Sequence, residues 1–258
     1  MSNLKGKNAI ITGASKGIGK AVATRLAQNG VNVVVAARTQ STLDEAIKDI
    51  KSKAAGVKVL GVATDVSRLE DLMRLVDTAK KELGPIDILI NNAGVSSQYP
   101  FEKQPLEDIE MLANTNYLGY VRLIRLVIPQ MIERKQGAII NMVSGSTLCD
   151  PLPKTFITYS SLKVGLRAFL KGLFWEMRDH GIKVTSILPG VVDTDLTDKL
   201  KDIAKEQKDR LMSPETVVDM IMFALSMPAN ACPLELAVIN QQTPWTKPVI
   251  DYEQKQAK

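Results

Sequence analysis

The hydrophobic residues of this chain are concentrated in short segments that alternate with longer stretches of mixed apolar and polar residues. Each short segment is rich in Val, Ile, Leu or Ala and almost continuously apolar, which is typical of strands covered on both faces of a sheet. Six of them are NAIIT (8–12), VNVVVAA (31–37), VKVLGVAT (57–64), IDILIN (86–91), GAIINMV (137–143) and KVTSIL (183–188). A late segment, LELAVI (234–239), is a candidate final strand.

The stretches between these segments carry signals for the ends of helices. Asn29-Gly30 and Gly84 are expected to stop helices, because a left-handed residue often follows the last turn. Ser67 to Glu70 matches a capping box, and Ser213 before Pro214 predicts an N-cap followed by proline at the first helical position. This regular alternation predicts an α/β fold with a parallel, doubly wound sheet and helices on both faces.

No low-complexity linker or short repeat divides the chain. We therefore predict one domain over residues 1–245, followed by a polar C-terminal tail at 246–258. The 258 residues, 45% hydrophobic and 24% charged, suit a soluble globular protein with a sizeable core. We find no apolar stretch of signal-peptide type and no run long enough to span a bilayer, so a cytoplasmic protein without a membrane span is expected.

Charge and cysteine content argue against several functional classes. The net charge is +5, but the basic residues are scattered among acids, so nucleic-acid binding is not expected. Two cysteines without a CxxC pair, and a single histidine, argue against a disulfide framework or a metal site. His180 precedes Gly181 where a helix is expected to end, which favours a capping cation over a catalytic base.

A glycine-rich turn joins the first strand to the first helix. In ITGASKGIGKAV (11–22), Gly13, Gly17 and Gly19 permit a tight turn and close backbone approach, and the helix N-terminus offers N–H groups to a phosphate. The second strand ends in AARTQ, with alanine where an acidic residue typically receives a ribose hydroxyl. Arg38 follows, and Lys16 lies in the glycine turn. Two cations there favour a 2′-phosphate, and so NADP(H) over NAD(H).

Tyr159 and Lys163 share one face of a predicted helix in YSSLK, which follows a loop after the fifth strand. The carboxyl ends of parallel strands are where an open α/β sheet binds its ligand. The fourth strand runs into NNAG (91–94) and the fifth into NMVSGS (141–146), so these polar groups are expected to meet at one edge.

TGASKGIG, NNAG, NTNYLG, the serine-bearing strand end, YSSLK and PGVVDT occur in the order found in the short-chain dehydrogenase/reductase family, which this chain resembles over nearly its whole length. The resemblance implies a single Rossmann-like domain, a nicotinamide cofactor, no catalytic metal and assembly into a homodimer or homotetramer. Amphipathic helices in 105–134 and 155–179 are candidates for the interface.

The resemblance also implies roles for single residues. Tyr159 is expected to be the general acid in carbonyl reduction and the general base in alcohol oxidation, with Lys163 lowering its pKa and holding the ribose. Asn116 is expected to support a water that resupplies the proton. The cofactor-binding residues are expected to be Gly13, Ser15, Lys16, Gly17, Ile18, Gly19, Arg38, Thr39, Asp65, Val66, Asn92, Gly94, Tyr159, Lys163, Val192 and Thr194.

Two serines compete for the place beside the substrate carbonyl, where a hydroxyl stabilises developing negative charge. Ser144 has the usual relation to the end of strand five, whereas Ser146 has the usual separation from the tyrosine. We choose Ser144, because the strand anchors the geometry. Asn91 is interpreted as stabilising the strand turn.

The substrate is expected to be a ketone or aldehyde with a hydrophobic substituent. The segments 95–101 and 147–156 and the residues after Thr194 are predicted to line its pocket, and residues 195–212 are predicted to form a charged covering helix. The apolar lining residues are expected to be Tyr99, Phe101, Leu148, Leu152, Phe156 and Leu196. Alternative substrates are a 3-hydroxy acid or a 3-oxoacyl thioester, and the alternative function is a non-catalytic NADP(H)-binding sensor or scaffold.

Overall fold

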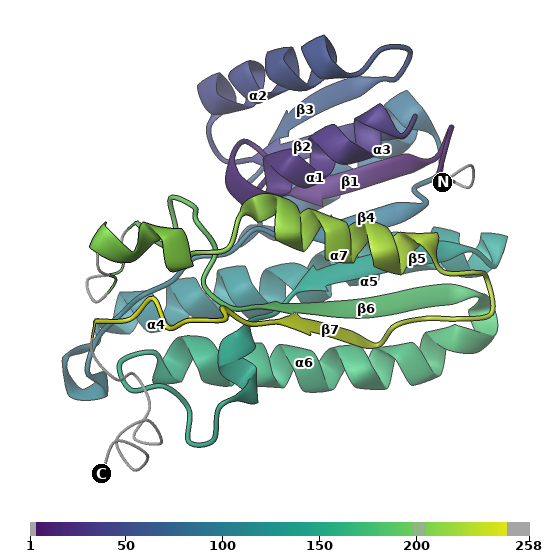
Figure 1. The fold of residues 1–258 in the computed structure, drawn as a ribbon. Coiled ribbons are helices and arrows are strands. Elements are labelled where there is room, and N and C mark those ends of the chain that lie inside the picture. The colour runs from purple at the N-terminus through teal and green to yellow at the C-terminus, as the bar shows by residue number, and fades with distance from the viewer. Residues whose placement is uncertain (1–3, 199, 201–202, 204, 247–258) are drawn as a thin grey trace.

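The protein folds around one seven-stranded sheet in which every neighbouring pair is parallel, in the order β3-β2-β1-β4-β5-β6-β7 (Figure 1). The computed structural model describes residues 4–198, 200, 203 and 205–246. The strands are β1 Asn8–Thr12, β2 Asn32–Ala37, β3 Val59–Ala63, β4 Ile88–Asn91, β5 Gly137–Met142, β6 Ile182–Pro189 and β7 Glu235–Val238. All seven predicted strands are present, with ends shifted by at most two residues.

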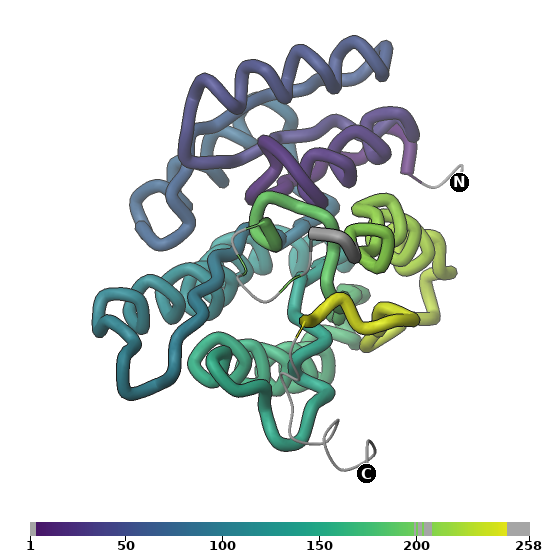
Figure 2. Tube along the Cα trace, turned by 60° about the vertical axis from the view of Figure 1, so that its left-hand side comes forward, coloured from purple at the N-terminus to yellow at the C-terminus, as the bar shows by residue number. Residues whose placement is uncertain are grey.

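Helices cover both faces of the sheet, which makes the fold a single-domain Rossmann-like α/β structure. The α-helices are α1 Gly17–Gln28, α2 Gln40–Lys53, α3 Leu69–Leu83, α4 Leu106–Ala113, α5 Gly119–Arg134, α6 Ile157–Met177 and α7 Pro214–Ser226. One core cluster joins α1, α2 and α7 to the sheet, and the other joins α3, α5 and α6 to its opposite face. The first three strands and the last three lie in opposite halves of the molecule (Figure 2).

The continuous apolar strands follow from this double covering. In β1, Ile11 packs into the cluster under α1 and α7, whereas Ile10 packs into the cluster under α3 and α5. Successive side chains of a strand point to opposite faces, so both must be apolar. None of the described helices is long and apolar enough to cross a membrane.

Most of the predicted helix ends are confirmed. Ser213 caps α7, because its hydroxyl accepts the N–H of Glu215 at 3.2 Å and Pro214 occupies the first helical position. Gly84 follows α3 with φ +92°, and Gly30 lies beyond the end of α1 with φ +80°.

The capping box predicted at Ser67 is wrong. Helix α3 begins at Leu69 after Arg68, and Ser67 instead donates from its N–H and hydroxyl to the Asp65 carboxylate at 2.9 and 2.7 Å. The Asp65 carboxylate, two residues earlier, is charged and therefore a strong acceptor. Its hydrogen bonds with Ser67 hold the serine in the β3–α3 turn, so the serine does not cap the helix.

The charged α-helix predicted for residues 195–212 is also wrong in the part that the structure describes. A 3₁₀ segment, Lys205–Arg210, replaces it. The predicted C-terminal tail lies outside the described residues except for Thr246.

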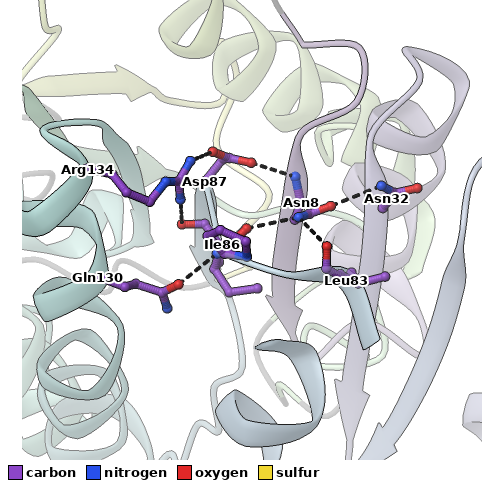
Figure 3. Close-up of polar contacts among 8 residues, drawn as sticks. Asn8, Asn32, Leu83, Ile86, Asp87, Gln130 and Arg134 are labelled. Carbon is purple, nitrogen blue, oxygen red and sulfur yellow. Dashed lines mark hydrogen bonds and ion pairs between the residues drawn. The ribbon is translucent and has the colours of Figure 1, made fainter. Parts of the chain in front are cut away.

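A polar network joins β1, β2, the α3–β4 connection and α5 at the amino end of the sheet (Figure 3). The Asn8 side chain donates to the carbonyls of Leu83 and Pro85 at 2.8 and 2.9 Å, and its N–H donates to the Asp87 carboxylate at 2.9 Å. Arg134 forms an ion pair with Asp87. Asp87 is 8% exposed, so this carboxylate is held by the network rather than by water.

Replacing Asp87 with alanine is expected to lower the free energy of unfolding by about 2–4 kcal/mol, because it leaves the Arg134 guanidinium and the Asn8 N–H without their acceptor. Urea denaturation would measure the loss. Asp77→Ala, at an exposed position of α3, is the matched control, with an expected change within about 0.5 kcal/mol. Equal losses in both variants would contradict a role for the network.

Candidate active site

The predicted site residues meet at the carboxyl ends of the strands, where they line a cavity of about 400 Å³. Of the predicted cofactor-binding and catalytic residues, all but Gly19 line it. Gly19 lies within α1, where an added Cβ would come within 2.4 Å of the Gly13 carbonyl oxygen. It therefore permits the close packing of the turn on its own helix.

The glycine turn has a left-handed backbone conformation and packs closely on the NNAG segment. Gly13 and Gly17 have φ values of +63° and +55°, a conformation in which side chains are strained. A Cβ on Gly13 would lie 2.8 Å from the Cα of Ala93, so the turn packs directly on the NNAG segment. The Asn92 amide donates to the Thr12 and Gly13 carbonyls at 2.9 and 3.2 Å. Asn92 therefore fixes the glycine turn while lining the cavity.

Two cationic side chains, Lys16 and Arg38, line the cavity, and Thr39 lines it next to Arg38. Arg38 and Thr39 are exposed, directly after the end of β2 at Ala37. Lys16 forms an ion pair with Asp195, a contact that links the glycine turn to the segment after β6. The sequence analysis did not foresee this pair, which joins residues 179 positions apart.

Lys163 is a buried residue in the wall of the cavity. Its side chain is 3% exposed, and its ammonium donates to the Met142 carbonyl at 2.8 Å and lies 4.6 Å from the centroid of the Tyr120 ring. Burial lowers the pKa of Lys163 from 10.5 to about 7. The proton on this ammonium is therefore exchangeable near neutral pH.

This shift predicts a pH-dependent contribution to stability. Between about pH 7 and pH 10.5 the unfolded chain retains a proton on Lys163 that the folded protein has lost, so the free energy of unfolding rises through that window. The difference between wild type and Lys163→Met in urea denaturation should therefore increase from pH 7 to pH 9. The difference for Lys48→Met, at an exposed site on α2, should stay constant. A constant difference for Lys163 would contradict the shift.

Tyr159 lies in the first turn of α6, one turn before Lys163. Burial raises the pKa of its phenol, while a hydrogen bond with the Ser144 hydroxyl lowers it. These two effects on the pKa oppose one another, and Tyr159 lines both this cavity and a second one. Tyr159 is therefore a titratable side chain at the boundary between the two cavities.

The two candidate serines have different partners. Ser144 precedes a 3₁₀ turn, Gly145–Leu148, and accepts the N–H of Ser146 at 3.1 Å in addition to bonding Tyr159. The Ser146 hydroxyl accepts from the buried Ser160 hydroxyl at 3.1 Å. Both line the second cavity, but the described contacts join only Ser144 to the tyrosine.

Asn116 is fully buried in a π-helical turn, Asn114–Leu118, between α4 and α5. Its amide accepts the N–H of Val95 at 3.0 Å and donates to the Val95 carbonyl at 2.8 Å. These two bonds fix the segment that follows NNAG. A π-helical turn alters the backbone hydrogen bonds of the helix, which is common at functional sites.

The remaining predicted residues line the cavity from the segments that follow β3 and β6. Asp65 and Val66 lie after β3, and the Asp65 N–H donates to the Asp71 carboxylate at 2.8 Å. Val192 and Thr194 lie after β6, where the Val192 carbonyl accepts from the Thr197 hydroxyl at 2.6 Å. Asn91 lies below the cavity and donates to Asn141 at 3.0 Å, which joins β4 to β5.

The second cavity, of about 410 Å³, adjoins the first at Ser144 and Tyr159. Phe156 and Leu196 line it as predicted, but Tyr99, Phe101, Leu148 and Leu152 do not. Tyr99, Phe101 and Leu148 are 39%, 62% and 47% exposed, because their loops turn outward. The missing wall comes from the segment after β7, including Ile239 and Trp245, whose ring meets that of Phe156 edge-on at 5.8 Å.

The profile that describes the short chain dehydrogenase family matches residues 7–205 of the chain, which span the glycine turn, the serine strand end, Tyr159 and Lys163. The chain belongs to the short-chain dehydrogenase family. It is thus an oxidoreductase by family, and its fold is the one that the resemblance drawn from the sequence implied. No group of three His, Cys, Asp or Glu placed to hold a metal ion occurs in the described part of this short-chain dehydrogenase.

Relatives of this short-chain dehydrogenase include proteins with named activities. It is 33% identical over 238 residues to an uncharacterized oxidoreductase of Staphylococcus saprophyticus, covering 92% of this chain and 99% of that one. It is 33% identical to the ketoacyl reductase HetN of a Nostoc species, covering 87% and 77%. The L-sorbose reductase of Gluconobacter frateurii, solved with NADPH and L-sorbose, matches with a TM-score of 0.81 and 31% identity over 92% of this chain and 96% of that chain.

Proposed function

We propose that this protein is an NADP(H)-dependent oxidoreductase that interconverts a ketone or aldehyde and its alcohol, with Tyr159 as the general acid and base. The observation that carries the proposal is the position of Ser144 and Tyr159, which line both the phosphate-turn cavity and the apolar cavity beside it. Hydride transfer requires a dinucleotide and a carbonyl carbon side by side, with a proton donor at the carbonyl oxygen.

The first cavity suits a nicotinamide dinucleotide. Gly13 and Gly17 allow the turn its left-handed backbone conformation, and the start of α1 presents N–H groups that suit a phosphate. Lys16 and Arg38 supply the positive charge for a 2′-phosphate, beside a strand end without an acidic residue. The reductase of Gluconobacter frateurii, which has the same fold, was solved with NADPH. When bound, the dinucleotide supplies or accepts the hydride.

The residues of the chain then handle the proton and the charge. In reduction, Tyr159 gives its phenolic proton to the carbonyl oxygen while the carbon receives a hydride, so that one C=O becomes one CH–OH. Ser144 donates a hydrogen bond to that oxygen as its negative charge develops. The Lys163 ammonium favours the phenolate that remains, and Asn116 supports the water that returns a proton. Alcohol oxidation reverses each transfer.

The second cavity favours a substrate with an apolar body. Phe156, Leu196, Leu200, Ile239 and Trp245 form its wall, with Ser96, Cys149 and Thr243 as polar points. Its described lining residues include neither lysine nor arginine, so a 3-hydroxy acid finds no cationic partner among them. We therefore favour an uncharged ketone or aldehyde over a 3-hydroxy acid, and a 3-oxoacyl thioester, whose acyl group carries no charge, stays the alternative.

The proposal is tested by following reduced nicotinamide absorbance with a panel of apolar ketones, aldehydes, L-sorbose, 3-oxo acids and 3-oxoacyl thioesters, using NADPH and NADH in parallel. We expect turnover with apolar ketones or aldehydes and a preference for NADPH. Tight NADPH binding with no turnover across the panel would instead support a sensor. Faster turnover with NADH would overturn the assignment of Lys16 and Arg38.

Arg38→Ala is expected to raise the KM for NADPH by about 10-fold and leave the KM for NADH unchanged, because the guanidinium faces a phosphate that NADH lacks. Steady-state kinetics with both cofactors would measure the split. Lys51→Ala, which removes an exposed cation from the last turn of α2, is the control and should change neither value. Equal changes for both cofactors in Arg38→Ala would refute the assignment.

We also propose a homo-oligomer built on α4 and α6. Five exposed apolar side chains lie on these helices or at their ends: Leu106, Met111, Ile157, Val164 and Trp175. Large exposed apolar residues in one region are typical of interfaces. Light scattering should give a dimer or a tetramer, and a monomer at all concentrations would contradict the proposal.

A further inference from the structure

Tyr120 lies in the wall of the dinucleotide-side cavity, where the sequence analysis assigned it no role. It belongs to the first turn of α5, four residues after Asn116, and is 2% exposed. The Lys163 ammonium lies over the Tyr120 ring, 4.6 Å from the ring centroid. The side chain therefore connects the π-helical turn to the lysine on α6.

Lys163 has few other partners. Its ammonium donates one hydrogen bond, to the Met142 carbonyl of β5, and none of the described ion pairs joins it to a carboxylate. The groups around it are thus the Tyr120 ring from α5, the Met142 carbonyl, and Tyr159 one turn earlier on its own helix. A cation over an aromatic face is stabilised most where water is excluded. The ring is therefore a principal support for this buried charge.

The Tyr120 hydroxyl has no hydrogen-bond partner in the described structure, although it is buried. Burial and the neighbouring Tyr159 raise the pKa of the Tyr120 phenol above its ordinary value, so it remains a neutral donor. A buried hydroxyl without a partner costs free energy unless a ligand or water meets it. Because Tyr120 lines the cavity, a molecule bound there is the candidate acceptor for this hydrogen bond.

We propose that Tyr120 is a positioning residue of this active site, whose ring holds the Lys163 ammonium in place and whose hydroxyl donates a hydrogen bond to the bound dinucleotide. The part that concerns the ring stands on the protein alone. The part that concerns the hydroxyl rests on the proposed function.

The ring is tested by titrating Lys163 in the protein without dinucleotide. The side-chain carbon next to Nζ is followed by NMR in protein containing carbon-labelled lysine, and the signal is assigned by its loss in Lys163→Met. Tyr120→Phe keeps the ring, so Lys163 should titrate within about 0.3 pH units of wild type. Tyr120→Met removes the ring at similar volume, so Lys163 should titrate about one pH unit lower.

Two results would overturn this part of the proposal. One is an unchanged titration in Tyr120→Met, and the other is a shift in Tyr120→Phe as large as that in Tyr120→Met. Tyr120→Leu serves as the second ring-free variant if Tyr120→Met does not fold. The pH profile of kcat/KM should move with the NMR titration, which a purely structural loss of activity would not do.

The hydroxyl is tested by the dissociation constant for NADPH, measured by fluorescence titration without turnover. Tyr120→Phe should weaken binding by about 5-fold, the usual effect of one neutral hydrogen bond. Tyr117→Phe is the control and should leave the dissociation constant unchanged. Tyr117 is a half-buried residue of the π-helical turn that does not itself line the cavity. Unchanged binding in Tyr120→Phe would overturn the hydroxyl's role. Wild-type protein that does not bind NADPH would overturn the proposed function, while the titration of Lys163 would still decide the role of the ring.

Discussion

Tyr159→Phe is expected to lower kcat for carbonyl reduction by about 10³-fold, because the substitution removes the only atom of this side chain that can transfer a proton. The ring and its half-buried packing on α6 remain, so the cavities keep their shape. NADPH binding should change by less than about 2-fold, since other residues hold the phosphates. Single-turnover measurements under saturating NADPH would isolate the chemical step.

Tyr99→Phe is the matched control for this variant. Tyr99 is 39% exposed and lies outside both cavity linings, so loss of its hydroxyl should leave kcat unchanged. Residual activity of Tyr159→Phe within about 10-fold of wild type would show that another group donates the proton. The Ser144 hydroxyl, which bonds Tyr159, would then be the first alternative.

Ser144→Ala is expected to lower kcat by about 10²-fold, because the substrate oxygen loses a donor as its charge develops. Ser146→Ala should lower it by less than about 3-fold, since that hydroxyl is bonded to Ser160. Steady-state kinetics on both variants compare the same chemical change two residues apart. A larger loss in Ser146→Ala would reverse the assignment of the two serines.

The sheet was predictable because its strands are apolar on both faces. Neighbours such as Ile10 and Ile11 enter opposite core clusters, so the pattern carries the information within a few residues. The glycine turn and the position of YSSLK were predictable for the same reason. Each is identified by the end of a strand or helix next to it in the sequence. The ends of strands in one parallel sheet then bring these local features together without further information.

The wall of the substrate-side cavity was not predictable in the same way. Trp245 lies 89 positions from Phe156, whose ring it meets, and nothing in either local pattern signals the contact. The clue to this contact is that β6 and β7 are neighbours in the sheet. The segments that follow adjacent parallel strands lie at the same edge. Tyr99 and Phe101 were chosen for chemistry and proximity in sequence, but the direction of their loop depends on its packing.

The hydrogen-bond and ion-pair partners of some polar side chains near the site were not predictable from spacing. Ser67 has a helix-capping pattern, yet the Asp65 carboxylate competes for it within the same turn. Lys16 lines the cavity as expected, but nothing in its sequence position indicates its ion pair with Asp195. Such choices depend on which charged partner lies nearest in space, and spacing along the chain does not determine that.

The substrate-side wall at Thr243 and Trp245 follows the last strand, which ends at Val238, and belongs to neither core cluster. Part of the wall of this cavity thus lies outside the segments that form the hydrophobic core. The residues after Val238 take no part in the pairing of β6 with β7, so substitutions there leave that pairing in place. Exchanging this short segment between relatives is therefore a direct route to new substrate ranges on an unchanged scaffold.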